Sequence, residues 1–194
     1  MNFLAHLYLS GDDEEITVGN FIGDFVKGSQ LDRYSEKIQK GIRLHRSIDQ
    51  FTDTNDIVLE SKVRLREQFR HFAPVIVDVF YDHFLAKDWL KYCHIPLLEY
   101  TENFYQTISN YFDQVPKGVI SMLTYMSRDN WLYNYQFIEG IDRALTGMSK
   151  RTNYENRMDE ASIALKKHYS EFEREFNLFF PELQAHVNNF EQTE

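Results

Sequence analysis

Apolar residues recur at helical spacing along almost the whole chain. In residues 74–92 they surround the segment on nearly every side, whereas in residues 35–53 they form one broad face. Only four prolines and eight glycines interrupt the pattern, and Pro74, Pro96, Pro116 and Pro181 fall near the starts of periodic segments. The pattern predicts helices over residues 3–9, 12–28, 35–53, 56–72, 74–92, 97–112, 117–133, 134–147, 154–179 and 181–191.

No internal repeat, low-complexity tract or linker divides the 194 residues, so we expect a single all-α domain, a multi-helix bundle spanning 1–194. A single cysteine, Cys93, excludes an internal disulfide and a cysteine-based zinc cluster. A formal net charge of −9 disfavours nucleic acid as a partner. With no secretory signal and no apolar stretch of membrane-spanning length, we expect a cytoplasmic protein that does not bind a membrane.

Two ionisable residues lie within the apolar face of the helix predicted over 35–53. His45 and Asp49 are four residues apart, so their side chains lie one above the other. Arg43 and Arg46 fall on the opposite side. Burying an unpaired charge is costly, and a bound cation compensates for it directly.

The helix predicted over 74–92 carries Asp78, Asp82 and His83 although it is apolar all round, which is typical of a buried helix. Asp78 and Asp82 lie one turn apart on one stripe. Buried carboxylates at this spacing repel each other unless they are protonated, paired with arginine or bound to metal.

The helices predicted over 3–9 and 12–28 add further residues of metal-ligand type. Asn20 and Asp24 are four residues apart among apolar neighbours, and His6 lies among Phe3, Leu4, Leu7 and Leu9. Four of the first five predicted helices therefore each place imidazole, carboxylate or amide groups on or beside an apolar face. Imidazole and carboxylate are ligands of manganese, iron and zinc.

Structural explanations stand beside each of these assignments. His6 alone is typical of a hydrogen-bonded core histidine, Asp24 is a possible partner of Lys27, and His45 with Asp49 could be a self-satisfied helix pair. For the Asp78–Asp82 pair a functional role is favoured over a structural one. The main indication of a functional site is that such residues recur over four helices. Basic residues form a candidate anion-binding face, although a solvated surface explains them better: Lys37, Lys40, Arg43, Arg46, Lys62, Arg64, Arg66 and Arg70.

The same segments resemble the acyl carrier protein phosphodiesterases. The resemblance is carried by residues 1–7 (MNFLAHL), 19–28 (GNFIGDFVKG), 41–49 (GIRLHRSID), Thr52-Asp53, Ala73-Pro74, Asp78, residues 82–85 (DHFL) and Trp89, with weaker echoes at Trp131-Leu132, Tyr135 and Gly147-Met148.

This resemblance implies a divergent relative of the HD-type metal phosphohydrolases, with an HD-domain-like helical fold and a divalent metal. Mn²⁺ is the expected metal, with Fe²⁺ and Mg²⁺ as alternatives. The implied reaction hydrolyses the phosphodiester between 4′-phosphopantetheine and the serine of holo-acyl carrier protein. The ordinary adjacent His-Asp pair is absent, since this chain has His45 with Asp49 and the reversed order Asp82-His83.

We therefore pool the candidates. The expected metal ligands are His6, Asp24, His45, Asp49, Asp78 and Asp82. The expected catalytic residues are Asp24, Asp82, His83 and Arg46: a carboxylate or His83 orients the water or protonates the departing serine oxygen, and Arg43 or Arg46 holds the phosphate or the partner. Because acyl carrier protein is itself acidic, docking requires a local basic patch on this acidic chain.

Three other interpretations remain. A metal phosphohydrolase acting on a nucleotide shares the same site chemistry, and a non-catalytic helical binding protein would use the acids as core ion pairs. A ferritin-like di-metal oxidase is disfavoured because the chain lacks Glu-x-x-His repeats on paired helices.

Overall fold

The computed structural model describes residues 1–193, apart from the side chains of residues 191 and 193. The all-α prediction is confirmed, since no strand occurs among these residues. The α-helices are α1 (Phe3–Tyr8), α2 (Glu14–Ile22), α3 (Glu36–Thr54), α4 (Asp56–Phe69), α5 (Ala73–Lys87), α6 (Leu97–Ser109), α7 (Lys117–Arg128), α8 (Trp131–Asn134), α9 (Ile138–Arg151), α10 (Ala161–Lys167) and α11 (Tyr169–Thr193). The 3₁₀ helices are η1 (Gly23–Phe25), η2 (Gly28–Arg33), η3 (Arg70–Phe72), η4 (Trp89–Lys91) and η5 (Met158–Glu160).

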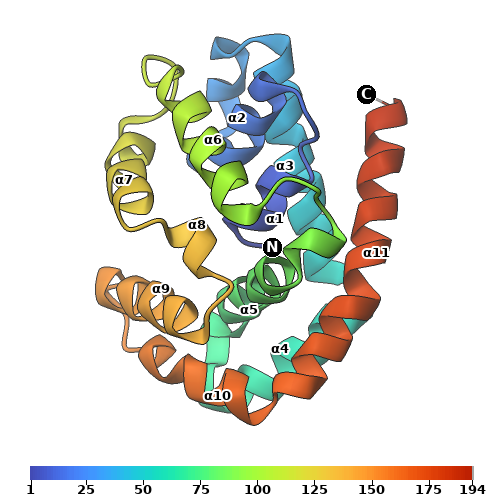
Figure 1. Cartoon of the computed structure of the whole chain (residues 1–194), viewed down its shortest axis with the longest axis vertical. Helices are drawn as coiled ribbons and strands as arrows, with labels where there is room; N and C mark the ends of the chain where they lie inside the picture. The colour runs from blue at the N-terminus through green and yellow to red at the C-terminus, as the bar shows by residue number, and fades with distance from the viewer. Residues whose placement is uncertain (194) are drawn as a thin grey trace.

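α5 runs through the middle of the molecule, with α1 above it, α11 along one edge and α6 to α9 along the other (Figure 1). Its side chains are buried from Val79 to Ala86 without a break, which confirms the buried helix that its apolar surroundings predict. The N-terminus lies at the centre of the view, beside α1 and α5 (Figure 1). Two polar side chains of α5, Asp78 and Asp82, contact the first residues of the chain.

α2 and α3 approach each other unusually closely because each has a glycine at the contact. A Cβ atom on Gly19 would lie 2.1 Å from the Ile38 carbonyl oxygen, and one on Gly41 would lie 2.2 Å from the Ile16 carbonyl oxygen. Both clashes involve backbone atoms, which cannot move aside cheaply. The two glycines thus fix the distance between the helix that carries Asn20 and the helix that carries His45.

Several predicted boundaries differ from the structure. The helix predicted over 12–28 ends at Ile22 and continues as η1 and η2, and Asn130 takes a left-handed conformation that separates α7 from α8. The break predicted at Pro181 is wrong, because α11 continues through this residue. Phe179, Phe180, Leu183 and Val187 are all buried on both sides of the proline, and their burial offsets the lost backbone hydrogen bond.

Candidate metal centre

Three side chains from two helices converge beneath the N-terminal segment. His6 comes from α1, and His45 and Asp49 come from α3, where their spacing of four residues stacks them on one face. One ligand atom from each of the three lies within 4.8 Å of the others, close enough for a single ion. Both histidines are buried, whereas the Asp49 side chain is 38% exposed and opens the group to solvent.

Asp49 bridges the two imidazoles. Its Oδ1 lies 3.2 Å from His6 Nε2, and its Oδ2 lies 3.1 Å from His45 Nε2. The rings are stacked, with centroids 4.1 Å apart and planes 22° from parallel. Both Nε2 atoms therefore address the same carboxylate from one side.

Asn20 fixes the orientation of both rings. Its side-chain Oδ1 lies 2.8 Å from His6 Nδ1, and its backbone oxygen lies 2.7 Å from His45 Nδ1. Asn20 Nδ2 donates to the His6 carbonyl and to Ser10 Oγ, so its Oδ1 faces the ring as an acceptor. Each Nδ1 must then carry the proton, which leaves each Nε2 free to bind a cation when the ring is neutral.

The pKa values of the group reflect close coupling between acids and bases. Burial lowers the pKa of His6. Burial also acts to lower the pKa of His45, but the hydrogen bonds that its ring donates to Asp24 and Asp49 outweigh burial and raise that pKa to about 9. Burial acts to raise the pKa of Asp49, yet the hydrogen bond from the protonated His45 ring holds it far below its usual range. The metal-free centre thus holds a proton on His45 at neutral pH, at a position where a metal ion can replace it.

Asp24 stands at the open edge of the centre. Its Oδ1 lies 3.1 Å from His45 Nε2, and its side chain is 71% exposed. The end of α2 at Ile22 brings Asp24 here, and Gly23 is required because a Cβ atom would lie 2.3 Å from Cγ of the His45 ring. The predicted catalytic residue Arg46 donates to the Val26 carbonyl oxygen at 3.0 Å, so it supports the loop that carries Asp24.

Asp78 is joined to the centre through the α-amino group of Met1. That nitrogen lies 3.1 Å from Asp78 Oδ1 and 3.8 Å from Asp49 Oδ1. Burial acts to lower the pKa of this amino group, but the charges of Asp78 and Asp49 raise it overall. The sequence pattern did not reveal this ammonium group, because no periodicity or motif identifies the packing of a chain terminus.

The predicted ligand Asp82 is engaged elsewhere. Its Oδ2 accepts from the Leu4 backbone N–H at 2.7 Å and its Oδ1 from the Ala5 N–H at 3.2 Å, so it caps the start of α1. Burial raises the pKa of Asp82 to about 7. Asp82 therefore supports the helix that carries His6, and the structure does not bring it into the group of His6, His45 and Asp49.

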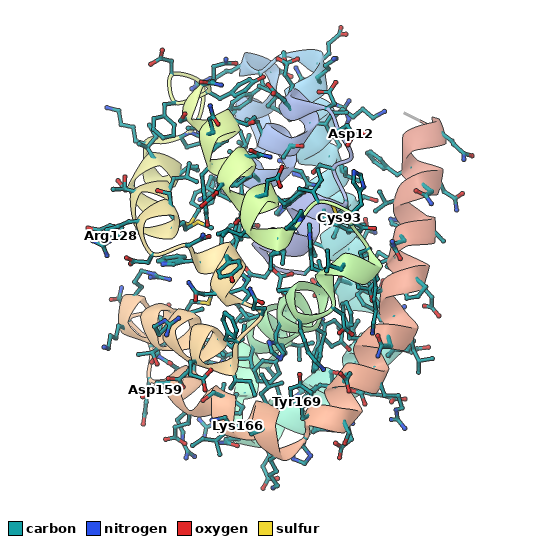
Figure 2. All side chains as sticks on the ribbon, in the orientation of Figure 1. Asp12, Cys93, Arg128, Asp159, Lys166 and Tyr169 are labelled. Atoms are coloured by element: carbon teal, nitrogen blue, oxygen red, sulfur yellow. The ribbon has the colours of Figure 1, made fainter. Side chains whose placement is uncertain are left out.

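The predicted catalytic residue His83 points in another direction. Its Nδ1 lies 2.8 Å from the Tyr135 carbonyl oxygen and its Nε2 lies 2.9 Å from the Tyr169 hydroxyl. Tyr169 begins α11, at the lower end of the molecule in Figure 2. About 100° of helix rotation separates His83 from Asp82, and this rotation directs His83 toward the C-terminal helices.

The residues present fit a divalent metal. Asp24, Asp49 and Asp78 supply three carboxylates, which the Met1 ammonium and one His45 proton do not fully neutralise. Replacing the His45 proton by a dication balances this charge. An all-helical fold with two histidines and an aspartate around one position is compatible with a divalent-metal hydrolase.

Comparison with known proteins identifies the family. The family model described as acyl carrier protein phosphodiesterase matches residues 1–183. Acyl carrier protein phosphodiesterases from Klebsiella pneumoniae (strain 342) and Enterobacter sp. (strain 638) are 33% and 31% identical to this chain over 190 residues, covering 97% of it and 98% of each relative. The corresponding protein of Photorhabdus laumondii is 30% identical over 192 residues, covering 97% of this chain and 96% of that protein. The chain belongs to the acyl carrier protein phosphodiesterase family.

No solved structure matches the chain, so the HD-domain-like arrangement stays a prediction. The single domain over 1–194 also stays a prediction. A search of the described helices for a membrane-spanning segment found none of sufficient length and apolarity.

Proposed function

We propose that this chain hydrolyses the phosphodiester between 4′-phosphopantetheine and the serine of holo-acyl carrier protein in the cytoplasm, with a divalent metal, Mn²⁺ by expectation, bound by His6, His45 and Asp49. The observation that supports it best is the shared carboxylate of Asp49, which lies 3.1–3.2 Å from the Nε2 atoms of two oriented imidazoles. The family match over residues 1–183 supports the substrate.

When bound, the metal supplies charge neutralisation for the phosphate oxygens and acidifies water. Asn20 keeps the two imidazoles oriented through their Nδ1 atoms. Asp24, on the open edge, is the group that accepts a hydrogen bond from the attacking water and aligns it with the phosphorus. Asp78 and the Met1 ammonium lie beside Asp49 and complete the charge balance.

The roles of Arg46, Asp82 and His83 change in this proposal. Arg46 is a positioning residue for the loop of Asp24, and Asp82 is a positioning residue for α1. His83 lies between Tyr135 and Tyr169, and we propose that it stabilises the packing of α11.

Incubation with holo-acyl carrier protein and Mn²⁺ tests the proposal, with mass spectrometry of the carrier protein as the measurement. We expect loss of the prosthetic group, abolished by a chelator and restored by added Mn²⁺. A panel of nucleotides run in parallel tests the other phosphohydrolase interpretation. An intact holo carrier protein after incubation with metal-loaded enzyme would contradict the proposal.

A further inference from the structure

The scissile bond of the proposed substrate lies on a serine side chain of the partner protein itself. The surface that binds the partner must therefore adjoin the metal centre, since a serine side chain is short. The partner is acidic and this chain carries a formal charge of −9, so the contact requires local positive charge that the rest of the protein does not neutralise.

A groove between α4 and the start of α5 has this character. Its volume is about 630 Å³, and its lining includes Leu59, Lys62, Val63, Arg66, Arg70 and His71. We call it the α4 groove. Among the described residues, no aspartate or glutamate lines it.

Two residues that line the α4 groove connect it to the helices that carry Asp49 and Asp78. Lys62 Nζ lies 2.8 Å from Oδ1 of Asp53, which follows Asp49 by one turn of α3. Pro74 lines the groove and precedes Asp78 by one turn of α5. One turn advances a helix by about 5.4 Å, so Pro74 lies about one turn from Asp78, and the Lys62 ammonium group contacts a residue about one turn from Asp49.

The other basic residues of the predicted anion-binding face are largely occupied. Lys37 pairs with Asp13 at 2.7 Å, Arg64 pairs with the buried Glu175 at 2.6 Å, and Arg46 donates to a backbone carbonyl. Arg66 and Arg70 are exposed and have no carboxylate within 4 Å in the part of the chain that the structure describes. Positive charge is thus available at the groove.

Apolar side chains share the same stripe of α4. Leu59 is 41% exposed and Val63 is 66% exposed, and they precede Arg66 by seven and three residues. Such spacing places all three on one helix face. A stripe that alternates apolar and basic groups complements an amphipathic helix whose polar residues are acidic.

We propose that the α4 groove is the docking surface for the carrier protein, and that it takes an acidic amphipathic helix next to the modified serine. This inference rests on the proposed function. Arg66 and Arg70 pair with carboxylates of that helix, and Leu59 and Val63 contact its apolar residues.

Charge-reversal variants test the docking surface. The main variant is Arg66→Glu with Arg70→Glu. Arg66→Gln with Arg70→Gln removes the two positive charges without reversing them, in case charge reversal at the end of α4 impairs folding. Val63→Glu places a repulsive charge at a position whose exposure leaves the core untouched.

The matched control is Arg143→Glu with Arg151→Glu. These arginines line a different cavity, of about 500 Å³, between α8 and α9. The control changes the net charge by the same amount as the main variant, so it separates a local effect from general electrostatic repulsion.

Three measurements are made on each full-length variant: KM and kcat with holo carrier protein, the Kd of apo carrier protein by calorimetry, and hydrolysis of bis(4-nitrophenyl) phosphate. We expect the groove variants to raise KM and Kd by about tenfold or more. The rate on the small diester stays unchanged, because it needs only the metal centre. The wild-type KM rises with ionic strength, and this dependence weakens in the groove variants.

An unchanged KM and Kd in folded groove variants, or an equal increase in the control, overturns the docking proposal. If the wild type binds carrier protein but does not hydrolyse it, the proposed function fails while the Kd values still test the groove. If the wild type hydrolyses the carrier protein and the groove variants do so equally well, only the docking proposal fails.

Discussion

His6 and His45 stack with their ring centroids 4.1 Å apart, and each presents Nε2 to a different oxygen of Asp49. Two stacked imidazoles that address one carboxylate repel each other if both are protonated. The arrangement accommodates one proton, or one metal ion that both rings share with Asp49. Competition between proton and metal at this position determines how the centre responds to pH.

Metal affinity should rise with pH below about 9. The pKa of His45 is raised to about 9 in the metal-free protein, so the ring is protonated at pH 7 and must lose that proton to bind a metal. One proton displaced per ion predicts an increase in Mn²⁺ affinity of about tenfold per pH unit. Calorimetry at pH 7 and pH 8, in two buffers of different ionisation enthalpy, measures both the affinity and the released proton. An affinity that does not change over this range argues against His45 as a ligand.

Gly23→Ala should weaken metal binding without unfolding the protein. The new Cβ atom would lie 2.3 Å from Cγ of the His45 ring, so the imidazole must leave its position between Asn20 and Asp24. Loss of ligand orientation typically costs ~10–100-fold in metal affinity. Gly118→Ala is the control, because a Cβ atom there meets nothing within 4 Å. Calorimetric titration with Mn²⁺ and circular dichroism follow both variants, and equal affinities would refute the steric argument.

Asp82→Ala should destabilise the fold, by about 2 kcal/mol, because the backbone N–H groups of Leu4 and Ala5 lose their acceptors. Metal binding would fall as a consequence, since α1 carries His6. Asp82→Asn retains one acceptor oxygen and should recover much of the stability measured by urea unfolding. A positioning role also predicts that saturating Mn²⁺ restores most of kcat in Asp82→Asn. If the variants kept wild-type stability but did not bind the metal, Asp82 would itself be a metal ligand.

The sequence predicts those parts of the centre that depend on a single helix. The spacing of His45 and Asp49 on a buried face of α3 follows from the helical period alone, and so does the burial of α5. Asp78 and Asp82 show where this reasoning ends, because they share a stripe but meet different partners. Asp78 contacts the Met1 ammonium, whereas Asp82 accepts two backbone N–H groups of α1. The packing of the N-terminal segment onto α5 decides between these partners, and no local pattern encodes it.

Contacts between helices were equally hard to foresee. Gly19 and Gly41 read as ordinary helix residues in the sequence, yet they set the close approach that brings Asn20 to His45. The end of α2 at Ile22 turns Asp24 toward His45, although apolar periodicity continues past this point. The pattern predicts a new helix starting at Pro181, but buried apolar residues on both sides of this proline keep α11 continuous.

The most direct measurement is Mn²⁺ binding and holo carrier protein hydrolysis by Asp49→Asn, with Asp159→Asn as the control. Asp159 is an exposed aspartate of η5 outside the centre (Figure 2). The amide should reduce both metal affinity and kcat by about 100-fold or more, because it removes the charge that both imidazoles share. The control should match the wild type. Full hydrolysis by a folded Asp49→Asn protein with unchanged Mn²⁺ affinity would contradict the metal centre described here.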